Sequence, residues 1–166
     1  MRYSKIVFTI ICALFLLLNT RVQAQAVKPI GKDSFLAILN TQHLNQPIIF
    51  NFWATWCKPC IEELPYFMQL DSALGKDSIA LVFLSFDSPS NPQKVEKFVR
   101  SKNIKGIHYL INDVDLDAFI TAVNPDWEGN IPYTILFNAH GRKDHGAAFN
   151  NLAELLIFIK NDVKKK

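Results

Sequence analysis

The sequence predicts an α/β fold in which helices cover both faces of a central mixed β-sheet. Two apolar runs, residues 48–53 and 79–86, are short and rich in β-branched and aromatic side chains, which is typical of buried parallel strands. Segments with a helical spacing of apolar residues separate such runs, and this alternation favours parallel pairing. Residues 138–141 read as a turn between two further strands, which adds an antiparallel hairpin.

The chain is long enough for one domain with a proper core, since it has 166 residues and a hydrophobic content of 49%. Strands are expected at residues 48–53, 79–86, 107–111, 134–137 and 142–149. Helices are expected from residue 32, from 57 to 74, at 93–102, at 115–123 and after Asn150 or Asn151. Asp33 or Ser34 should cap the first helix, and Pro65 should kink the second.

The first 24 residues have the pattern of a secretory signal peptide. Arg2 and Lys5 precede an apolar stretch of 13 residues, 6–18, and small residues allow cleavage after Ala24 or Ala26. That stretch is short for a membrane span, which needs about 20 residues, although an uncleaved N-terminal anchor is the alternative. The expected mature protein is therefore a single domain, 25–166, in the periplasm or cell envelope.

The net charge gives no reason to expect nucleic acid or an anionic membrane as a partner. The chain has 18 Lys and Arg residues against 15 Asp and Glu, but three of the basic residues lie in the first 24, so 15 of each remain. Export would also leave Cys57 and Cys60 as the only cysteine pair, because Cys12 lies within the apolar stretch.

Cys57-Lys58-Pro59-Cys60 stands where a buried strand passes into a helix. The first turn of a helix has unpaired N–H groups and a partial positive charge, which stabilise a thiolate. Cys57 would be the exposed nucleophile at this helix start, Lys58 adds positive charge, and Pro59 is suited to the first turn. Cys60 is close enough in sequence to form a disulfide with Cys57, so the motif predicts a reversible dithiol/disulfide couple.

The segment Phe-Trp-Ala-Thr-Trp-Cys-Lys-Pro-Cys, residues 52–60, resembles the active site of the thioredoxin superfamily. The continuation Ile-Glu-Glu-Leu-Pro, residues 61–65, resembles the exported TlpA/ResA-like thiol-disulfide oxidoreductases. The resemblance implies a thioredoxin-like fold over essentially the whole mature chain, with Trp56 beside the cysteine pair. Asn51 stands where thioredoxins proper carry a buried aspartate that assists the inner cysteine.

Glu63 is the candidate to take over that role. It follows Cys60 by three residues and borders the apolar helix stripe, whereas Glu62 should face water. A partly buried carboxylate has a raised pKa, which suits a proton acceptor for Cys60. A solvated glutamate in the second turn is the alternative. The resemblance also implies a functional glutamate at this position.

Ile131-Pro132 resembles the superfamily loop that places a cis-proline against the cysteine pair. The backbone of Ile131 would then pair with a substrate chain. The alternative for Pro132 is a proline at the first position of a strand. Trp127 is expected either to pack in the core or to lie on the rim that contacts a partner.

No metal or other cofactor is expected, so the disulfide is the only redox group. His140 and His145 have a spacing compatible with half a zinc site, but the cysteines are too distant in sequence for a zinc finger. His43 and His108 are expected to be ordinary surface or loop histidines.

We therefore expect a thiol-disulfide oxidoreductase that acts on disulfides or thiols of envelope proteins. The resemblance implies a reductant that a membrane-bound thiol donor recharges, with cytochrome c maturation as one known task of such relatives. The alternatives are an envelope disulfide oxidase or isomerase, and a non-catalytic thioredoxin-fold binding module. A peroxidase of the related peroxiredoxin type would need a threonine three residues before the reactive cysteine, whereas Thr55 is two residues before Cys57.

Overall fold

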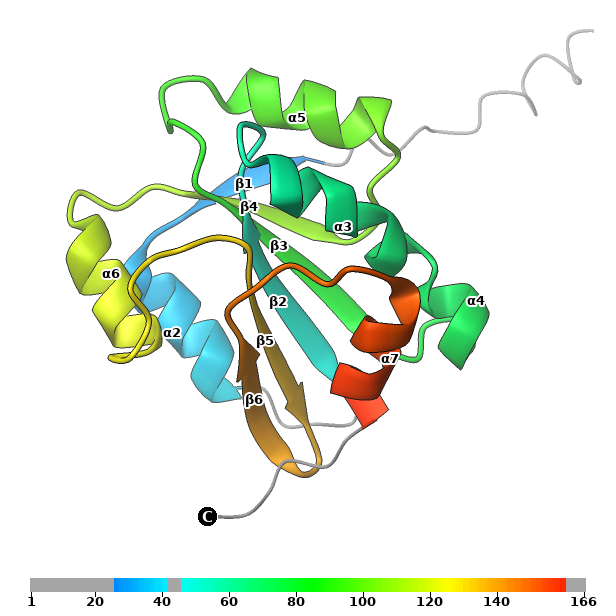
Figure 1. The fold of residues 1–166 in the computed structure, drawn as a ribbon. Coiled ribbons are helices and arrows are strands. Elements are labelled where there is room, and N and C mark those ends of the chain that lie inside the picture. Colours follow the sequence, from blue (N-terminus) through cyan, green and yellow to red (C-terminus); the bar gives the residue numbers. More distant parts are fainter. Residues whose placement is uncertain (1–25, 42–45, 161–166) are drawn as a thin grey trace, which may run out of the picture.

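The computed structural model describes residues 26–41 and 46–160. Its centre is a six-stranded sheet in the order β1-β4-β3-β2-β5-β6 (Figure 1). The first four strands in this order pair in parallel, and β5 and β6 continue the sheet as an antiparallel hairpin. The strands are β1 (Val27–Ile30), β2 (Ile48–Trp53), β3 (Ala80–Ser85), β4 (Ile107–Ile111), β5 (Tyr133–Asn138) and β6 (Gly141–His145).

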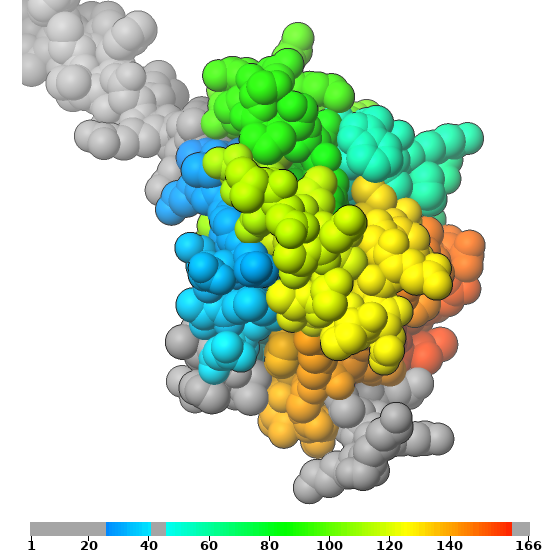
Figure 2. Space-filling view, turned by 90° about the vertical axis from the view of Figure 1, so that its left-hand side faces the viewer, coloured from blue at the N-terminus to red at the C-terminus, as the bar shows by residue number. Residues whose placement is uncertain are grey.

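Helices lie on both faces of this sheet, as the alternation of elements predicted. One face packs against α3 (Lys58–Met68), α4 (Leu70–Leu74), α5 (Pro92–Ser101) and α7 (Leu152–Lys160). The other face packs against α2 (Lys32–Thr41) and α6 (Leu116–Val123). Figure 2 shows α2 in blue and α6 in yellow-green side by side on that second face.

Every residue of β2 is buried, which explains why its sequence shows no polar alternation. β2 pairs in parallel with β3 and antiparallel with β5, so it lies in the interior of the sheet. Its carboxyl end leads directly into the turn before α3. The start of α3 therefore follows a fully buried strand that is paired on both sides.

Several element boundaries differ from the expectation. β1 was not predicted, because it is a four-residue edge strand whose middle residues are exposed and include Pro29. β6 ends at His145, so the expected strand to residue 149 is too long. The helix expected to run to Leu74 breaks at Gln69 into α3 and α4.

The start of the first helix also differs from the prediction. Phe35 N–H donates to the carbonyl of Gly31, so Asp33 and Ser34 lie inside the first turn and neither caps α2. The last helix follows the prediction, since Glu154 N–H donates to Asn151 Oδ1.

Within the described residues, no helix is long and apolar enough to span a membrane. The predicted signal peptide, 1–24, and His43 lie outside the described residues.

Candidate active site

Cys57 and Cys60 form a disulfide at the amino end of α3, with their Cα atoms 5.3 Å apart. Cys57 is the N-cap of the helix, and its Sγ accepts the N–H of Cys60 at 3.3 Å. Pro59 follows in the first turn, where its missing N–H costs no hydrogen bond. Cys60 is fully buried and only 5% of Cys57 is accessible, so the expected exposed nucleophile is far less exposed than predicted.

The Ile131-Pro132 peptide bond is cis, as the resemblance implied. The carbonyl oxygen of Ile131 lies 3.8 Å from Cys57 Sγ, so this loop covers one side of the disulfide. Pro132 precedes β5, which pairs with β2 next to the cysteine helix. The sheet thus brings together two segments that lie more than 70 residues apart in sequence.

Glu63 is fully buried on α3, three residues after Cys60. Its Oε1 accepts the side-chain amide of Asn51 at 2.9 Å, and its Oε2 accepts the backbone N–H of Phe149 at 2.9 Å. The same Asn51 Nδ2 lies 3.1 Å from Thr134 Oγ1 on β5. Burial raises the pKa of Glu63 to about 7, and the two hydrogen bonds only partly oppose that rise. The solvated alternative for Glu63 is therefore wrong.

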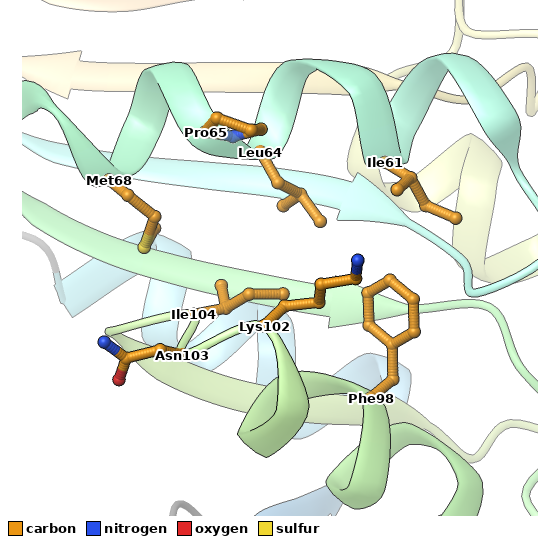
Figure 3. A pocket seen from close by; sticks show the side chains of 8 residues that line it. All are labelled: Ile61, Leu64, Pro65, Met68, Phe98, Lys102, Asn103 and Ile104. Carbon is orange, nitrogen blue, oxygen red and sulfur yellow. The ribbon is translucent and has the colours of Figure 1, made fainter.

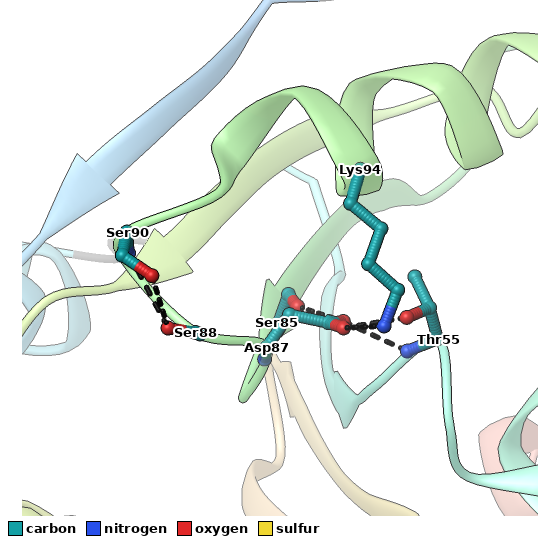
Figure 4. Close-up of polar contacts among 6 residues, drawn as sticks. All are labelled: Thr55, Ser85, Asp87, Ser88, Ser90 and Lys94. Atoms are coloured by element: carbon teal, nitrogen blue, oxygen red, sulfur yellow. Dashed lines mark hydrogen bonds and ion pairs between the residues drawn. The ribbon is translucent and has the colours of Figure 1, made fainter.

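Asp87 is a buried carboxylate at this site that sequence reasoning missed (Figure 4). It accepts the Thr55 backbone N–H at 2.8 Å, the Thr55 hydroxyl at 2.5 Å and the Ser85 hydroxyl at 2.8 Å. Lys94 Nζ adds an ion pair at 3.3 Å. Burial opposes ionisation of Asp87, but these donors outweigh it and hold its pKa below the ordinary value.

Asp87 therefore anchors the turn that leads into the cysteine motif, since Thr55 is two residues before Cys57. Cys57 N–H closes this turn on the carbonyl of Ala54. The only sequence signal was an acidic residue directly after a buried strand, in a segment that reads as a loop.

Around the disulfide, Trp56 is 63% exposed and is the most accessible side chain of the motif's aromatic residues. Lys58 points to solvent and pairs with Glu62 at 3.7 Å, so the prediction that Glu62 faces water is confirmed. Trp127 is buried and stacks on Tyr133 at 4.3 Å, which confirms the core alternative.

An apolar groove with a volume of about 330 Å³ runs between α3 and α5 (Figure 3). Ile61, Leu64 and Met68 on α3 face Phe98 and Ile104 across it, and Lys102 lies at its side. The groove begins one residue after Cys60 but contains neither cysteine.

The expectation for His108 is wrong. Its ring is buried, stacks on Phe83 at 5.3 Å, and bonds through Nε2 to the carbonyl of Ile104. His145 stacks on Phe149 at 4.3 Å. No group of three or more His, Cys, Asp or Glu side chains in the described part of the chain is arranged to hold a metal ion.

A model of the AhpC/TSA family matches residues 29–142. The chain belongs to the AhpC/TSA family. Among curated family relatives, the sporulation thiol-disulfide oxidoreductase A of Bacillus subtilis is 38% identical over 60 residues, which are 36% of each chain. Thiol-disulfide oxidoreductase ResA of Geobacillus thermodenitrificans is 28% identical over 102 residues, 61% of this chain and 54% of ResA. The chain thus spans about half or less of the length of these curated relatives.

Solved structures agree with this assignment. StoA from Bacillus subtilis matches with a TM-score of 0.52 and 26% identity, over 70% of this chain and 84% of StoA. A thioredoxin-related protein from Neisseria meningitidis matches with a TM-score of 0.59 over 74% of this chain and 87% of that chain; at 21% identity it shows the fold alone. The predicted thioredoxin-like fold and the predicted likeness to ResA-type oxidoreductases are confirmed.

Proposed function

We propose that the protein is a thiol-disulfide oxidoreductase that reduces disulfides of cell-envelope proteins through Cys57 and Cys60. The observation that carries this proposal is the disulfide at the amino end of α3 with a fully buried carboxyl, Glu63, one turn farther along the helix. A structural disulfide has no use for such a carboxyl. The disulfide itself holds the two electrons, so the reaction needs no other cofactor.

In the reduced protein, the thiolate of Cys57 attacks one sulfur of the substrate disulfide. A mixed disulfide forms, and the other substrate sulfur leaves as a thiolate. The Cys60 N–H, which points at Cys57 Sγ, stabilises the Cys57 thiolate before the attack.

Glu63 then accepts the proton of the Cys60 thiol, and the resulting thiolate attacks Cys57 Sγ. The mixed disulfide breaks, the substrate leaves as its second thiolate, and Cys57 and Cys60 hold the new disulfide. Two electrons have passed to the substrate. A pKa near 7 lets Glu63 exist as carboxylate or acid at neutral pH, so it can take up this proton and later return it.

The substrate chain is expected to dock between Trp56 and the Ile131-Pro132 loop, which flank the disulfide. The carbonyl of Ile131 supplies a backbone acceptor 3.8 Å from Cys57 Sγ. Because only 5% of Cys57 is accessible, a narrow extended segment fits better than a globular surface.

The pattern of residues 1–24 supports export to the periplasm or cell envelope, with an uncleaved anchor as the alternative. Each cycle reduces one substrate disulfide and leaves Cys57 and Cys60 oxidised, so the pair must regain two electrons, for which a membrane-bound thiol donor is the proposed partner. Cytochrome c maturation is one task that fits a reductant of this class. An alternative peroxidase has less support, because Thr55 donates its hydroxyl to Asp87 and the position three residues before Cys57 is Ala54.

The test is the reduction potential of the Cys57–Cys60 couple, measured by equilibration against glutathione and dithiothreitol buffers. A value near or below about −270 mV supports a reductant, whereas about −120 to −180 mV makes the protein an oxidase or isomerase. Absence of any reversible titration would leave only a binding module.

A further inference from the structure

The two carboxyl oxygens of Glu63 have different hydrogen-bond partners, and this decides which of them can carry a proton. Oε2 accepts the backbone N–H of Phe149, a donor that can never become an acceptor. A hydroxyl at Oε2 would find no acceptor in the Phe149 N–H, whereas Oε1 faces Asn51, whose side chain also carries an acceptor, so we place the proton taken up by Glu63 on Oε1. In the present arrangement Asn51 turns a donor, Nδ2, toward that oxygen at 2.9 Å. Once Oε1 is protonated, two hydrogens would face each other across this contact.

Asn51 has an unused group that resolves this conflict. Its Oδ1 is buried and has no hydrogen-bond partner, although the residue is fully enclosed in the sheet. Turning the side-chain amide by half a revolution exchanges Oδ1 and Nδ2 without moving other atoms. Oδ1 would then accept the proton of the acid, and Nδ2 would take the unpaired place. Each orientation thus leaves one amide atom without a partner.

Thr134 fits both orientations for the same chemical reason. Its Oγ1 lies 3.1 Å from Asn51 Nδ2, and a hydroxyl both donates and accepts. It accepts from Nδ2 in one orientation and donates to Oδ1 in the other. An aspartate at position 51 has no N–H to offer, so it could pair only with the acid form of Glu63.

We propose that Asn51 is a positioning residue for Glu63 whose side-chain amide turns with the proton: Nδ2 faces the carboxylate and Oδ1 faces the carboxylic acid. This inference rests on the proposed function, in which Glu63 exchanges a proton with Cys60. In this arrangement three side chains handle the proton together: the carboxyl of Glu63 on α3, the amide of Asn51 on β2 and the hydroxyl of Thr134 on β5.

The other titratable groups on this face of the sheet bear on any measurement of pH dependence. They include the Cys60 thiol in the reduced protein, Tyr66 on α3, His108 on β4, Lys143 and His145 on β6, and Glu154 on α7. Burial raises the pKa of Glu63, the hydrogen bonds from Phe149 and Asn51 partly oppose that rise, and no charged neighbour is among the causes. Burial lowers the pKa of His145.

The experiment uses the full oxidised chain and NMR of two labelled groups, the side-chain carboxyl carbon of Glu63 and the side-chain amide of Asn51. Between pH 5 and pH 9 both signals should move with one common midpoint near 7. Proton contacts between the Asn51 amide and the Thr134 side chain should be strong at pH 9 and weak at pH 5. Unchanged contacts across the titration would overturn the proposal.

Glu63→Gln provides a second, independent readout. Its oxygen must accept the Phe149 N–H, so its NH₂ group faces Asn51 and should hold Oδ1 toward it at every pH. The Asn51 signals of this variant should match those of the unmodified protein at pH 5. Signals that match the pH 9 spectrum would contradict the amide turn.

Glu62→Gln is the matched control, because it removes the neighbouring exposed carboxyl and should leave the Asn51 titration unchanged. Reversible reduction of the disulfide in the unmodified protein is measured alongside. Loss of reversible reduction contradicts the proposed function. Normal redox titration with a fixed Asn51 amide contradicts only the inference about Asn51.

Discussion

Replacing Glu63 by glutamine should stabilise the oxidised protein at alkaline pH and leave its stability almost unchanged in acid. The folded carboxyl has a pKa of about 7 against 4.5 for an ordinary glutamate, so folding favours its protonated form. Below pH 4.5 both the folded and the unfolded chain carry the proton, and the burial penalty is absent. As pH rises toward 7, the unfolded chain ionises freely while the folded chain resists, and the wild type loses stability.

The size of the effect follows from the width of this window. One pH unit corresponds to about 1.4 kcal/mol, so the full penalty is about 3 kcal/mol above pH 7. Glutamine has a similar shape and never ionises. The difference in unfolding free energy, Glu63→Gln minus wild type, should therefore rise from near zero at pH 4 to about 3 kcal/mol at pH 8.

Urea unfolding of the oxidised proteins, followed by tryptophan fluorescence, measures this difference at several pH values. With an m-value of about 1.5 kcal/mol/M, the midpoint of the variant at pH 8 should lie about 2 M higher. Other shifted groups, such as Asp87 with its lowered pKa, affect both proteins equally and cancel in the difference. A difference that does not vary with pH would show that Glu63 titrates normally and would refute the reasoning.

Four other substitutions test individual features of the site and of the backbone. Cys60→Ser should accumulate a 1:1 mixed disulfide with glutathione on Cys57, detectable by mass spectrometry, and an adduct-free protein would contradict the assigned order of attack. Asp87→Ala leaves buried N–H and hydroxyl donors without an acceptor and should lower the free energy of unfolding in urea by about 2–4 kcal/mol. Lys94→Met should lower it by about 1 kcal/mol or less, because the Lys94 side chain is 54% exposed. Gly106→Ala should lower the free energy of unfolding by about 1–3 kcal/mol in the same assay, because φ of Gly106 is 132° and the new Cβ would lie 2.8 Å from a carbonyl oxygen of β3. An unchanged urea midpoint would contradict this backbone geometry.

The parts of the site that are local in sequence could be predicted. Cys57, Cys60 and Glu63 lie on one helix, so helical spacing alone places the carboxyl next to the inner cysteine. The cis bond at Pro132 followed from a resemblance, because sequence spacing has no signal for it.

The parts that depend on strand register could not be predicted. Asn51 and Thr134 are direct partners across β2 and β5, and this pairing joins residues 83 positions apart. Asp87 meets Thr55 because parallel strands β2 and β3 end side by side, although Asp87 stands in a loop-like sequence. The burial of His108 also depends on strand register, since its ring stacks on Phe83, the residue opposite it across β3 and β4.

The burial of Glu63 lowers the stability of the folded protein at neutral pH, and this cost is evidence about the role of the carboxyl. A side chain needed only for packing at this position would be apolar, and even glutamine would avoid the penalty of about 3 kcal/mol at neutral pH. The surrounding donors reduce that penalty without removing it, and they leave the carboxyl poised between its two protonation states. A binding module without turnover gains nothing from this arrangement, whereas a resolving thiol that must lose and regain a proton does. The stability lost at Glu63 therefore favours chemistry at Cys60 over a purely structural disulfide.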